Sequence, residues 1–402
     1  MSKWLTIIGM GEDGYDALST ASRLAISEAE VVVGSARLLA FLPQIAAQLQ
    51  EWPQPFSAVV QLIKPLTGRR TVVLATGDPL NYGVARKLLE FIPFAEMRII
   101  PHLSAFSLAA AHLGWSLPDC DTLTLHGRDA ANIESFIQPG ARLIVLTADA
   151  TTIAEVARRL TARGFGKSAI TVLENMGGAR ERILSFAADS PLQQSFSDLN
   201  TLAIACVASP DAKIFSRLAG LPDDAFVHDG QITKRDVRAA TLAALAPAPD
   251  QLLWDVGAGC GSVAIEWMRG TRGCEAIAFE SDAARLKMIA VNADGLGTPR
   301  LKTVAGAAPA SFVGQPTPDA VFIGGGLGDA GVFEAAWAAL RPGGRMVINV
   351  VTLEGELHLV DLQEKLGGDL VRMEISNLAH VGPFRALRPR MAVLQWRAVK
   401  PW

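Results

Sequence analysis

The chain has 402 residues, of which 50% are hydrophobic and 19% are charged, and its formal net charge is −3. This length and composition predict two packed domains and exclude a disordered chain. The scattered basic residues form no track for a polyanion, so we expect neither nucleic acid nor a membrane surface as a partner. No apolar segment reaches the roughly 18 residues of a membrane span, and the N-terminal apolar run is too short for a signal peptide, so we expect a cytoplasmic protein.

The cysteines are widely spaced and form no CxxC pair. They are Cys120, Cys206, Cys260 and Cys274. This spacing favours free, buried thiols over a redox or metal site, so we expect no metal.

Short β-rich runs alternate with amphipathic, Ala/Leu-rich segments along almost the whole chain, which predicts α/β architecture. In the first half we expect strands at 4–9, 30–34, 70–76, 97–101, 122–127, 141–147, 168–175 and 201–208. Helices are expected between them at 19–29, 82–91, 104–113 and 152–163. Around residues 181–189 strands follow one another without helices, which predicts an antiparallel portion.

A connecting region rich in turn residues spans 210–228, and a new series of elements begins after it. A helix at 235–245 is followed by strands at 252–256, 275–280, 319–325 and 345–351, with helices at 261–269, 282–293 and 329–340. This order predicts a parallel, doubly wound sheet. The expected domains are therefore 1–210 and 228–402.

The segment DVGAGCG (255–261) places glycines at 257, 259 and 261 directly after a predicted strand. The third glycine stands one place earlier than in the dinucleotide fingerprint GxGxxG. Asp255 at the strand end would repel a pyrophosphate but could accept hydrogen bonds from an ammonium group. Glu280 ends the next strand, where an acid can accept both ribose hydroxyls. These residues favour a ligand with a cationic head, with NAD binding or a ligand-free turn as alternatives.

This loop, Glu280 and the segment LRPGGRMVINVV (340–351) together resemble class I S-adenosylmethionine methyltransferases. Within that class, ITKRDVRAATLAAL (232–245), AGAAPASF (305–312) and PDAVFIGGGLG (318–328) resemble the decarboxylating methyltransferases of cobalamin biosynthesis that act on C15 of a precorrin. The resemblance implies a Rossmann-like domain. It assigns the cofactor to Thr233, Asp255, Gly257, Ala258, Gly259, Cys260, Gly261, Glu280, Ala307 and Ala308. That family often has Asp where this chain has Ala307, so only backbone contacts are expected there.

Five segments of the first half follow one another in an order that resembles the tetrapyrrole methylases, in particular those that methylate C5 of a precorrin. They are IIGMGEDG (7–14), GDPLNYG (77–83), PHLSAFSLAAAHLG (101–114), LHGR (125–128) and LENMGGARERI (173–183). The resemblance implies two α/β subdomains with S-adenosylmethionine between them. It assigns this cofactor to Gly77, Asp78, Leu80, Ser104, Ala105, Asn175 and Met176.

The two resemblances cover about 1–208 and 228–400 and imply one bifunctional enzyme with two S-adenosylmethionine sites. It would methylate C5 and C15 of the tetrapyrrole and release the C12 acetate as CO2, giving precorrin-8. A cobalt-containing substrate is the alternative, and an RNA methyltransferase or a ligand sensor are competing functions. Since the cofactor and the macrocycle supply the reactivity, no catalytic side chain is assigned.

The basic segment HVGPFRALRPR (380–390) is a hypothetical substrate contact. Arg385, Arg388 and Arg390 could bind the acetate and propionate groups of the macrocycle, the alternative being solvated surface arginines. We expect a homo-oligomer, because the tetrapyrrole methylases that the first half resembles are commonly dimers.

Overall fold

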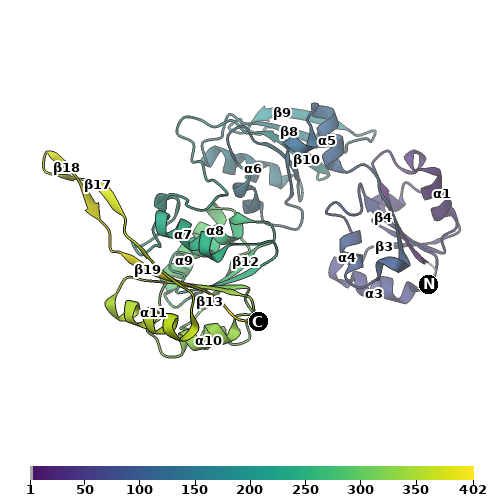
Figure 1. Ribbon diagram of the computed structural model, residues 1–402. Coiled ribbons are helices and arrows are strands. Elements are labelled where there is room, and N and C mark those ends of the chain that lie inside the picture. Colours follow the sequence, from purple (N-terminus) through teal and green to yellow (C-terminus); the bar gives the residue numbers. More distant parts are fainter. Residues whose placement is uncertain (1–2) are drawn as a thin grey trace. The chain divides into compact units, whose positions relative to one another are not determined.

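The computed structural model describes residues 3–402, which form two compact units (Figure 1). The first unit consists of residues 3–130 and 138–213, and the second of residues 131–137 and 214–402. The chain therefore changes unit after residues 130, 137 and 213, an interruption that the sequence did not predict. Among the residues described, no helix has the length and apolar character that crossing a membrane requires.

The first unit contains a parallel sheet with the strand order β3-β2-β4-β1-β5. Its strands are β1 (Leu5–Met10), β2 (Val31–Gly34), β3 (Gln48–Glu51), β4 (Thr71–Thr76) and β5 (Met97–Ile100). The associated helices are α1 (Thr20–Ser27), α2 (Ala36–Leu39), α3 (Val59–Ile63) and α4 (Ala85–Leu89). Val31 and Val33 pack in one apolar cluster and Val32 in another, so both faces of the sheet are covered. Continuous β-branched runs are typical of such strands.

A second sheet of the same unit has the order β6-β7-β10-β8-β9. Its strands are β6 (Asp121–Thr124), β7 (Arg142–Leu146), β8 (Ala169–Glu174), β9 (Arg182–Ala187) and β10 (Asn200–Ala205). The helices of this part are α5 (Ala105–Leu113) and α6 (Thr151–Ala162). Because β9 pairs with β8, and β10 with both β7 and β8, in antiparallel fashion, the antiparallel portion expected around residues 181–189 is confirmed.

The second unit is built on a sheet with the order β13-β12-β11-β14-β15-β19-β16. Its strands are β11 (Leu252–Val256), β12 (Glu275–Glu280), β13 (Lys302–Ala305), β14 (Ala320–Ile323), β15 (Arg345–Val350), β16 (Asp369–Met373) and β19 (Val393–Val399). The helices are α7 (Arg235–Leu245), α8 (Ser262–Gly270), α9 (Ala283–Gly295), α10 (Val332–Ala339) and α11 (Leu353–Leu366). The strands from β11 to β15 are parallel, and β19 is antiparallel to β15 and β16. The predicted doubly wound sheet and the α/β fold class are confirmed.

Short 3-10 helices complete the two units. They are η1 (Tyr15–Ala17), η2 (Phe56–Ala58), η3 (Lys64–Leu66), η4 (Phe94–Glu96), η5 (Leu117–Asp119), η6 (Ala130–Ser135), η7 (Asp223–Ala225) and η8 (Ala310–Phe312).

Aromatic side chains tie the central strands of the second unit to the loop after β13. Trp254 of β11, Phe279 of β12 and Phe312 of η8 form a buried trio whose ring centroids lie 4.9–5.2 Å apart. Tilted and edge-to-face rings at this spacing attract one another beyond the gain from burial. The trio therefore holds the Ala307–Ala308 segment, just before η8, at one end of the sheet.

A two-stranded hairpin, β17 (Ser376–Val381) and β18 (Phe384–Pro389), projects from the second unit (Figure 1). Its apolar side chains are largely in solvent, with Leu378, Phe384 and Leu387 between 63% and 74% exposed. Leu378 and Leu387 are register partners, so they form a contiguous apolar surface on one face.

Candidate active site

The second unit has a large cavity at the carboxyl edge of its sheet. Its volume is about 1280 Å³, and its walls come from loops after β11, β12, β13, β14 and β15 and from residues flanking β16 and β19. The cavity includes the crevice between the carboxyl ends of β11 and β14, where the strand order reverses. In doubly wound folds this crevice is where ligands bind.

The glycine loop after β11 brings backbone into close contact with a second loop. Gly257, Gly259 and Gly261 have φ values of 66°, 58° and 80°, a region that residues with a Cβ adopt at a cost. A Cβ added to Gly257 would lie 2.8 Å from the carbonyl oxygen of Gly325 in the loop after β14. The first glycine is therefore required both for its conformation and for this approach.

Asp255 lies at the end of β11 under the glycine loop. Its side chain is 1% exposed, and its Oδ2 accepts a hydrogen bond of 3.0 Å from the backbone N–H of Ala264, while Oδ1 has no hydrogen-bond partner among the described residues. Burial, together with repulsion from Glu280, raises the pKa of Asp255 to about 7. A cationic group placed beside Oδ1 would offset that penalty.

Glu280 joins the end of β12 to the glycine loop. Its Oε2 accepts from the N–H of Gly259 at 2.8 Å, and its Oε1 accepts from Ser281 and Asp282 at 2.9 and 3.0 Å. These donors fix the carboxylate at the cavity wall, where the second lone pair of Oε2 remains for a hydroxyl ligand.

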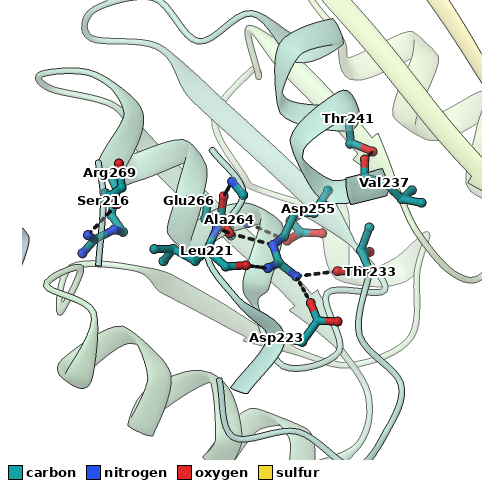
Figure 2. Close-up of polar contacts among 12 residues, drawn as sticks. Ser216, Leu221, Asp223, Thr233, Val237, Thr241, Asp255, Ala264, Glu266 and Arg269 are labelled. Carbon is teal, nitrogen blue, oxygen red and sulfur yellow. Dashed lines mark hydrogen bonds and ion pairs between the residues drawn. The ribbon is translucent and has the colours of Figure 1, made fainter. Parts of the chain in front are cut away.

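A buried arginine, Arg238, holds the segment before α7 in place, and its partners Leu221, Asp223, Thr233 and Glu266 are labelled in Figure 2. Arg238 is 0% exposed and donates to Glu266, Asp223 and the carbonyl oxygens of Leu221 and Thr233. Its guanidinium also lies 4.8 Å from the ring centroid of Phe226. Since Thr233 lines the cavity, this network sets the position of one of its walls.

Most of the residues predicted for this cofactor site lie together in the cavity wall. Those that line it are Thr233, Asp255, Gly257, Ala258, Gly259, Glu280, Ala307 and Ala308. The side chain of Cys260 instead packs in a buried apolar cluster with Ile265 and Leu296, and Gly261 lies beside Ile289 of α9. The loop alternates between the cavity and the interior of the domain, and Cys260 and Gly261 occupy the interior positions.

We call the part of the wall described so far the glycine-loop half, and the remainder the far half. The far half comprises residues from 324–329, 349–358, 373–375 and 390–393. It has apolar side chains such as Met373, Ile375 and Met391, with a few polar groups among them. A flat, largely apolar molecule with polar substituents suits such a surface.

Sequence reasoning missed two polar residues of the far half. Asn349, at the end of β15, donates to Thr241 at 2.8 Å and accepts from the buried Gln395 at 2.7 Å. His358 lines the same half from α11, a helix that was not expected. Asn349 is the polar residue within an otherwise apolar run, MVINVV, near the end of β15, which was a usable signal because polar residues at carboxyl strand ends face the crevice.

The three arginines predicted to bind substrate lie in different surroundings. Arg390 lines the far half of the cavity. Arg385 and Arg388 lie on the exposed strand β18, opposite His380 and Asn377, and do not line it. The structure thus brings only Arg390 beside the cavity residues.

In the first unit, the predicted residues after β4 meet the start of α5. Gly77 has a φ of 62°, and a Cβ there would lie 3.2 Å from the carbonyl oxygen of Leu103 and 3.6 Å from Cα of Ser104. Ser104 caps α5 by accepting from the N–H of Ser107 at 3.2 Å. Asp78 likewise accepts from the N–H of Leu80 at 2.8 Å, so this turn is fixed by its own side chain.

The other predicted residues of the first unit follow β8. Asn175 adopts a φ of 46° and bonds the carbonyl oxygen of Arg180, and Met176 packs in the apolar cluster that contains Phe106 and borders Ala105. A Cβ on Gly178 would lie 2.7 Å from Cβ of Glu12, in the loop after β1. Both predicted groups thus lie near α5 and the loops of the parallel sheet.

The second unit fits the S-adenosylmethionine that its resemblance implies. Asp255 offers an unpartnered buried oxygen for an ammonium group, Glu280 offers an acceptor for ribose hydroxyls, and Gly257 leaves space that a Cβ would fill. A dinucleotide pyrophosphate would meet two carboxylates here, which disfavours it.

Comparisons with known proteins cover both halves of the chain. Residues 4–190 match the family model of tetrapyrrole (corrin/porphyrin) methylases, and residues 224–400 match that of a precorrin methyltransferase domain. A precorrin-6Y C(5,15)-methyltransferase (decarboxylating) from a Sinorhizobium species is 43% identical over 401 residues, which is 100% of this chain and 97% of that one. A protein of the same name from Mycobacterium tuberculosis is 39% identical and covers 98% of this chain and 100% of its own.

Among solved structures, the C-terminal domain of a precorrin-6Y C5,15-methyltransferase from Rhodobacter capsulatus is 44% identical, with a TM-score of 0.44. It covers 46% of this chain and 100% of its own. From the full-length similarity and the two domain matches, we conclude that the chain belongs to the precorrin-6Y C(5,15)-methyltransferase (decarboxylating) family.

Proposed function

We propose that this chain methylates C5 and C15 of precorrin-6Y with S-adenosylmethionine and releases the C12 acetate as CO2, giving precorrin-8. Similarity over the full length to relatives named for this activity carries the proposal. The buried carboxylates beside the glycine loop support it, because they suit a cationic cofactor better than a dinucleotide. The cobalt-containing substrate of the anaerobic branch is the alternative.

The two reactions are divided between residues 1–210 and 228–402. We assign C5 methylation to the first domain and C15 methylation with decarboxylation to the second. The separate family matches, to tetrapyrrole methylases and to a precorrin methyltransferase domain, support this division.

Each domain has its own S-adenosylmethionine site, so the chain binds the cofactor twice. The first site uses Gly77, Asp78, Leu80, Ser104, Ala105, Asn175 and Met176. The second uses Thr233, Asp255, Gly257, Ala258, Gly259, Glu280, Ala307 and Ala308, with backbone contacts at Ala307 and Ala308. Cys260 and Gly261 shape the glycine loop from its interior side.

The cofactor supplies an activated methyl group when bound, so the side chains around it bind and orient. Asp255 pairs with the ammonium group, and Glu280 accepts hydrogen bonds from the ribose. The glycine loop approaches the ligand with backbone alone. Aligning donor and acceptor in a chamber that excludes water supplies most of the rate in such transfers.

The substrate occupies the far half of the cavity. Arg390 pairs with one of its carboxylates at the cavity wall. Arg385 and Arg388 add positive charge on β18 and attract the polyanionic macrocycle over a distance of about one Debye length, roughly 8–10 Å at physiological salt.

The chain assembles into a homo-oligomer through the hairpin β17–β18. Leu378 and Leu387 on one face of the hairpin, and Phe384 on the other, expose an apolar surface. Exposed apolar patches of this kind mark interaction sites. Light scattering of wild type and of a Phe384→Ser, Leu387→Ser variant tests this. A monomeric wild type contradicts the proposal.

The function is tested by incubating the chain with precorrin-6Y and S-adenosylmethionine and measuring product mass. We expect two methyl additions and loss of CO2. Titration calorimetry with S-adenosylhomocysteine should give two sites per chain and, for Asp255→Asn, one site of unchanged affinity. Methylation without CO2 loss would contradict the assignment of the second domain.

A further inference from the structure

Loss of CO2 from the substrate creates a demand for a proton that no residue yet meets. The bond between the acetate methylene and its carboxylate breaks, and its electron pair passes into the conjugated macrocycle. A proton must then be added to the methylene carbon to leave a methyl group. The balance is R–CH2–CO2⁻ + H⁺ → R–CH3 + CO2, so a proton donor is needed beside C12.

The proton donor has to lie in the far half of the cavity. C12 and C15 of a tetrapyrrole are separated only by C13 and C14. A macrocycle bound with C15 facing the glycine-loop half of the cavity therefore has C12 close by. A substrate bound in this way would have its C12 acetate among the side chains that flank β15, β16 and β19.

Few side chains of the far half suit the role of proton donor. Asp329 and Glu354 are exposed to solvent, so neither is enclosed with the substrate. Arg390 is already assigned to pairing with a substrate carboxylate, which leaves it no part in proton transfer. Imidazole is the side chain that both holds and releases a proton near neutral pH, and His358 is the histidine in the cavity wall.

His358 is held in place by aromatic packing. It lies on α11 and is half-buried, with its ring 6.3 Å from that of Phe333 on α10 in an edge-to-face arrangement. Phe333 is 6% exposed and belongs to the core, so the imidazole packs beside a rigid neighbour. The partial exposure lets water return a proton after each turnover.

Charged groups near His358 are either paired elsewhere or share its wall. Glu356 on α11 pairs with Arg372 of β16 at 2.7 Å, and Arg397 of β19 donates to Gln395 at 2.6 Å. The other charged residues around it are Glu354 and Asp361 on its own helix, Asp329 and exposed Glu334 on the α10 side, and Arg390 before β19.

We propose that His358 is the general acid of the decarboxylation and protonates the methylene carbon as CO2 leaves. The inference rests on the proposed function of the second domain. In full, R–CH2–CO2⁻ + imidazolium → R–CH3 + CO2 + imidazole: the C–C bond breaks, a C–H bond forms, and solvent restores the imidazolium.

The test compares wild type with His358→Gln and with Glu364→Gln, an exposed position on the same helix. Release of CO2 and transfer of each methyl group from precorrin-6Y are followed separately, with C5 methylation by the first domain as the internal reference. We expect His358→Gln to release CO2 about 100-fold more slowly, because a positioned acid contributes on the order of 100-fold or more. C5 methylation and the affinity for S-adenosylhomocysteine should stay within about 3-fold of wild type, and added imidazole should restore part of the release.

A second measurement needs no variant. The rate of CO2 release by wild type at saturating substrate should fall as the pH rises, because the proposed step consumes a protonated donor. A rate that does not fall, or a His358→Gln chain that releases CO2 as fast as wild type, would overturn the proposal. A higher KM with unchanged kcat would also overturn it. A wild type that methylates C5 and C15 but releases no CO2, or that does neither, would refute the proposed function as well.

Discussion

Arg238 donates through Nε to Oε1 of Glu266 over 2.6 Å, and both side chains are almost fully buried, at 0% and 2% exposed. The pair joins α7 to α8, and further bonds from Arg238 reach the segment whose residue Thr233 lines the cavity. Removing the charge of Glu266 leaves the fully buried Arg238 with only the partly exposed Asp223 as a carboxylate partner, and loss of a buried partner is strongly destabilising.

We therefore expect Glu266→Gln to lower the free energy of unfolding of the chain by about 3–5 kcal/mol. Arg372→Ala breaks the exposed pair with Glu356 and should cost about 0–1 kcal/mol. Scanning calorimetry of both variants measures the difference. Equal costs would mean that the buried network does not stabilise the second unit.

The glycine loop gives a second prediction. Gly257→Ala should abolish one of the two S-adenosylhomocysteine sites, because its Cβ would lie 2.8 Å from the carbonyl oxygen of Gly325 and its φ is 66°. Gly314→Ala is the matched control, since Gly314 has a φ of 75° and nothing within 4 Å of the added Cβ. Backbone strain of about 1–3 kcal/mol is then common to both, and only the first variant also has the clash. Calorimetry showing the same loss of binding in both would contradict the role of the Gly257–Gly325 contact.

Asp255 makes the stability of the ligand-free chain depend on pH. Its folded-state pKa of about 7 lies above the unfolded value of 3.8, so the folded chain binds the proton more tightly. The resulting contribution of Asp255 to the free energy of unfolding is fully present below about pH 4 and is lost as the pH rises to about 7. At about 1.4 kcal/mol for each pH unit, it amounts to roughly 4 kcal/mol.

Asp255→Asn should remove that trend. The stability of wild type minus that of the variant is expected to fall between pH 4 and pH 7 and to stay constant above, measured by urea unfolding without ligand. Asp361→Asn, at an exposed position of α11, serves as the control. Parallel stability curves for wild type and Asp255→Asn would refute the prediction.

The arginines near the cavity give a prediction on substrate binding. Arg390→Ala should raise the KM for precorrin-6Y about tenfold or more, because a charge-assisted contact at the cavity wall is lost, with S-adenosylhomocysteine affinity unchanged. Arg388→Ala, on exposed β18, should weaken binding less, and its effect should vanish at high salt. Steady-state kinetics at two salt concentrations separate the two, and a larger, salt-independent effect at Arg388 would reverse the assignment.

The sequence was most informative where burial imposes a pattern. The run Val31–Val33 and the strand before Gly257 are buried, and their apolar runs predicted the strands. Strand β3 has the sequence QLQE and is mostly exposed, so no apolar pattern marks it. The residues from α11 to β19 were also not predicted, and with them the wall that contains His358 was missed.

Individual site residues depended on loop geometry that spacing cannot supply. The motif DVGAGCG placed Cys260 in the loop, but only a three-dimensional path shows that its side chain turns into the apolar cluster with Ile265. Similarly, Arg385, Arg388 and Arg390 look equivalent in sequence, and the hairpin separates the first two from the cavity.

The seven residues 131–137 belong to the second unit, so the order of synthesis determines when their contacts can form. Ile133 and Ile137 are fully buried, and Ser135 bonds Leu296 and Arg269. At about 5–20 residues per second, a ribosome makes Leu296 on the order of ten seconds after Ser135. During that interval Ser135 lacks the residues of the second unit that it bonds, so this segment takes up its final contacts only after the whole first unit has been synthesised.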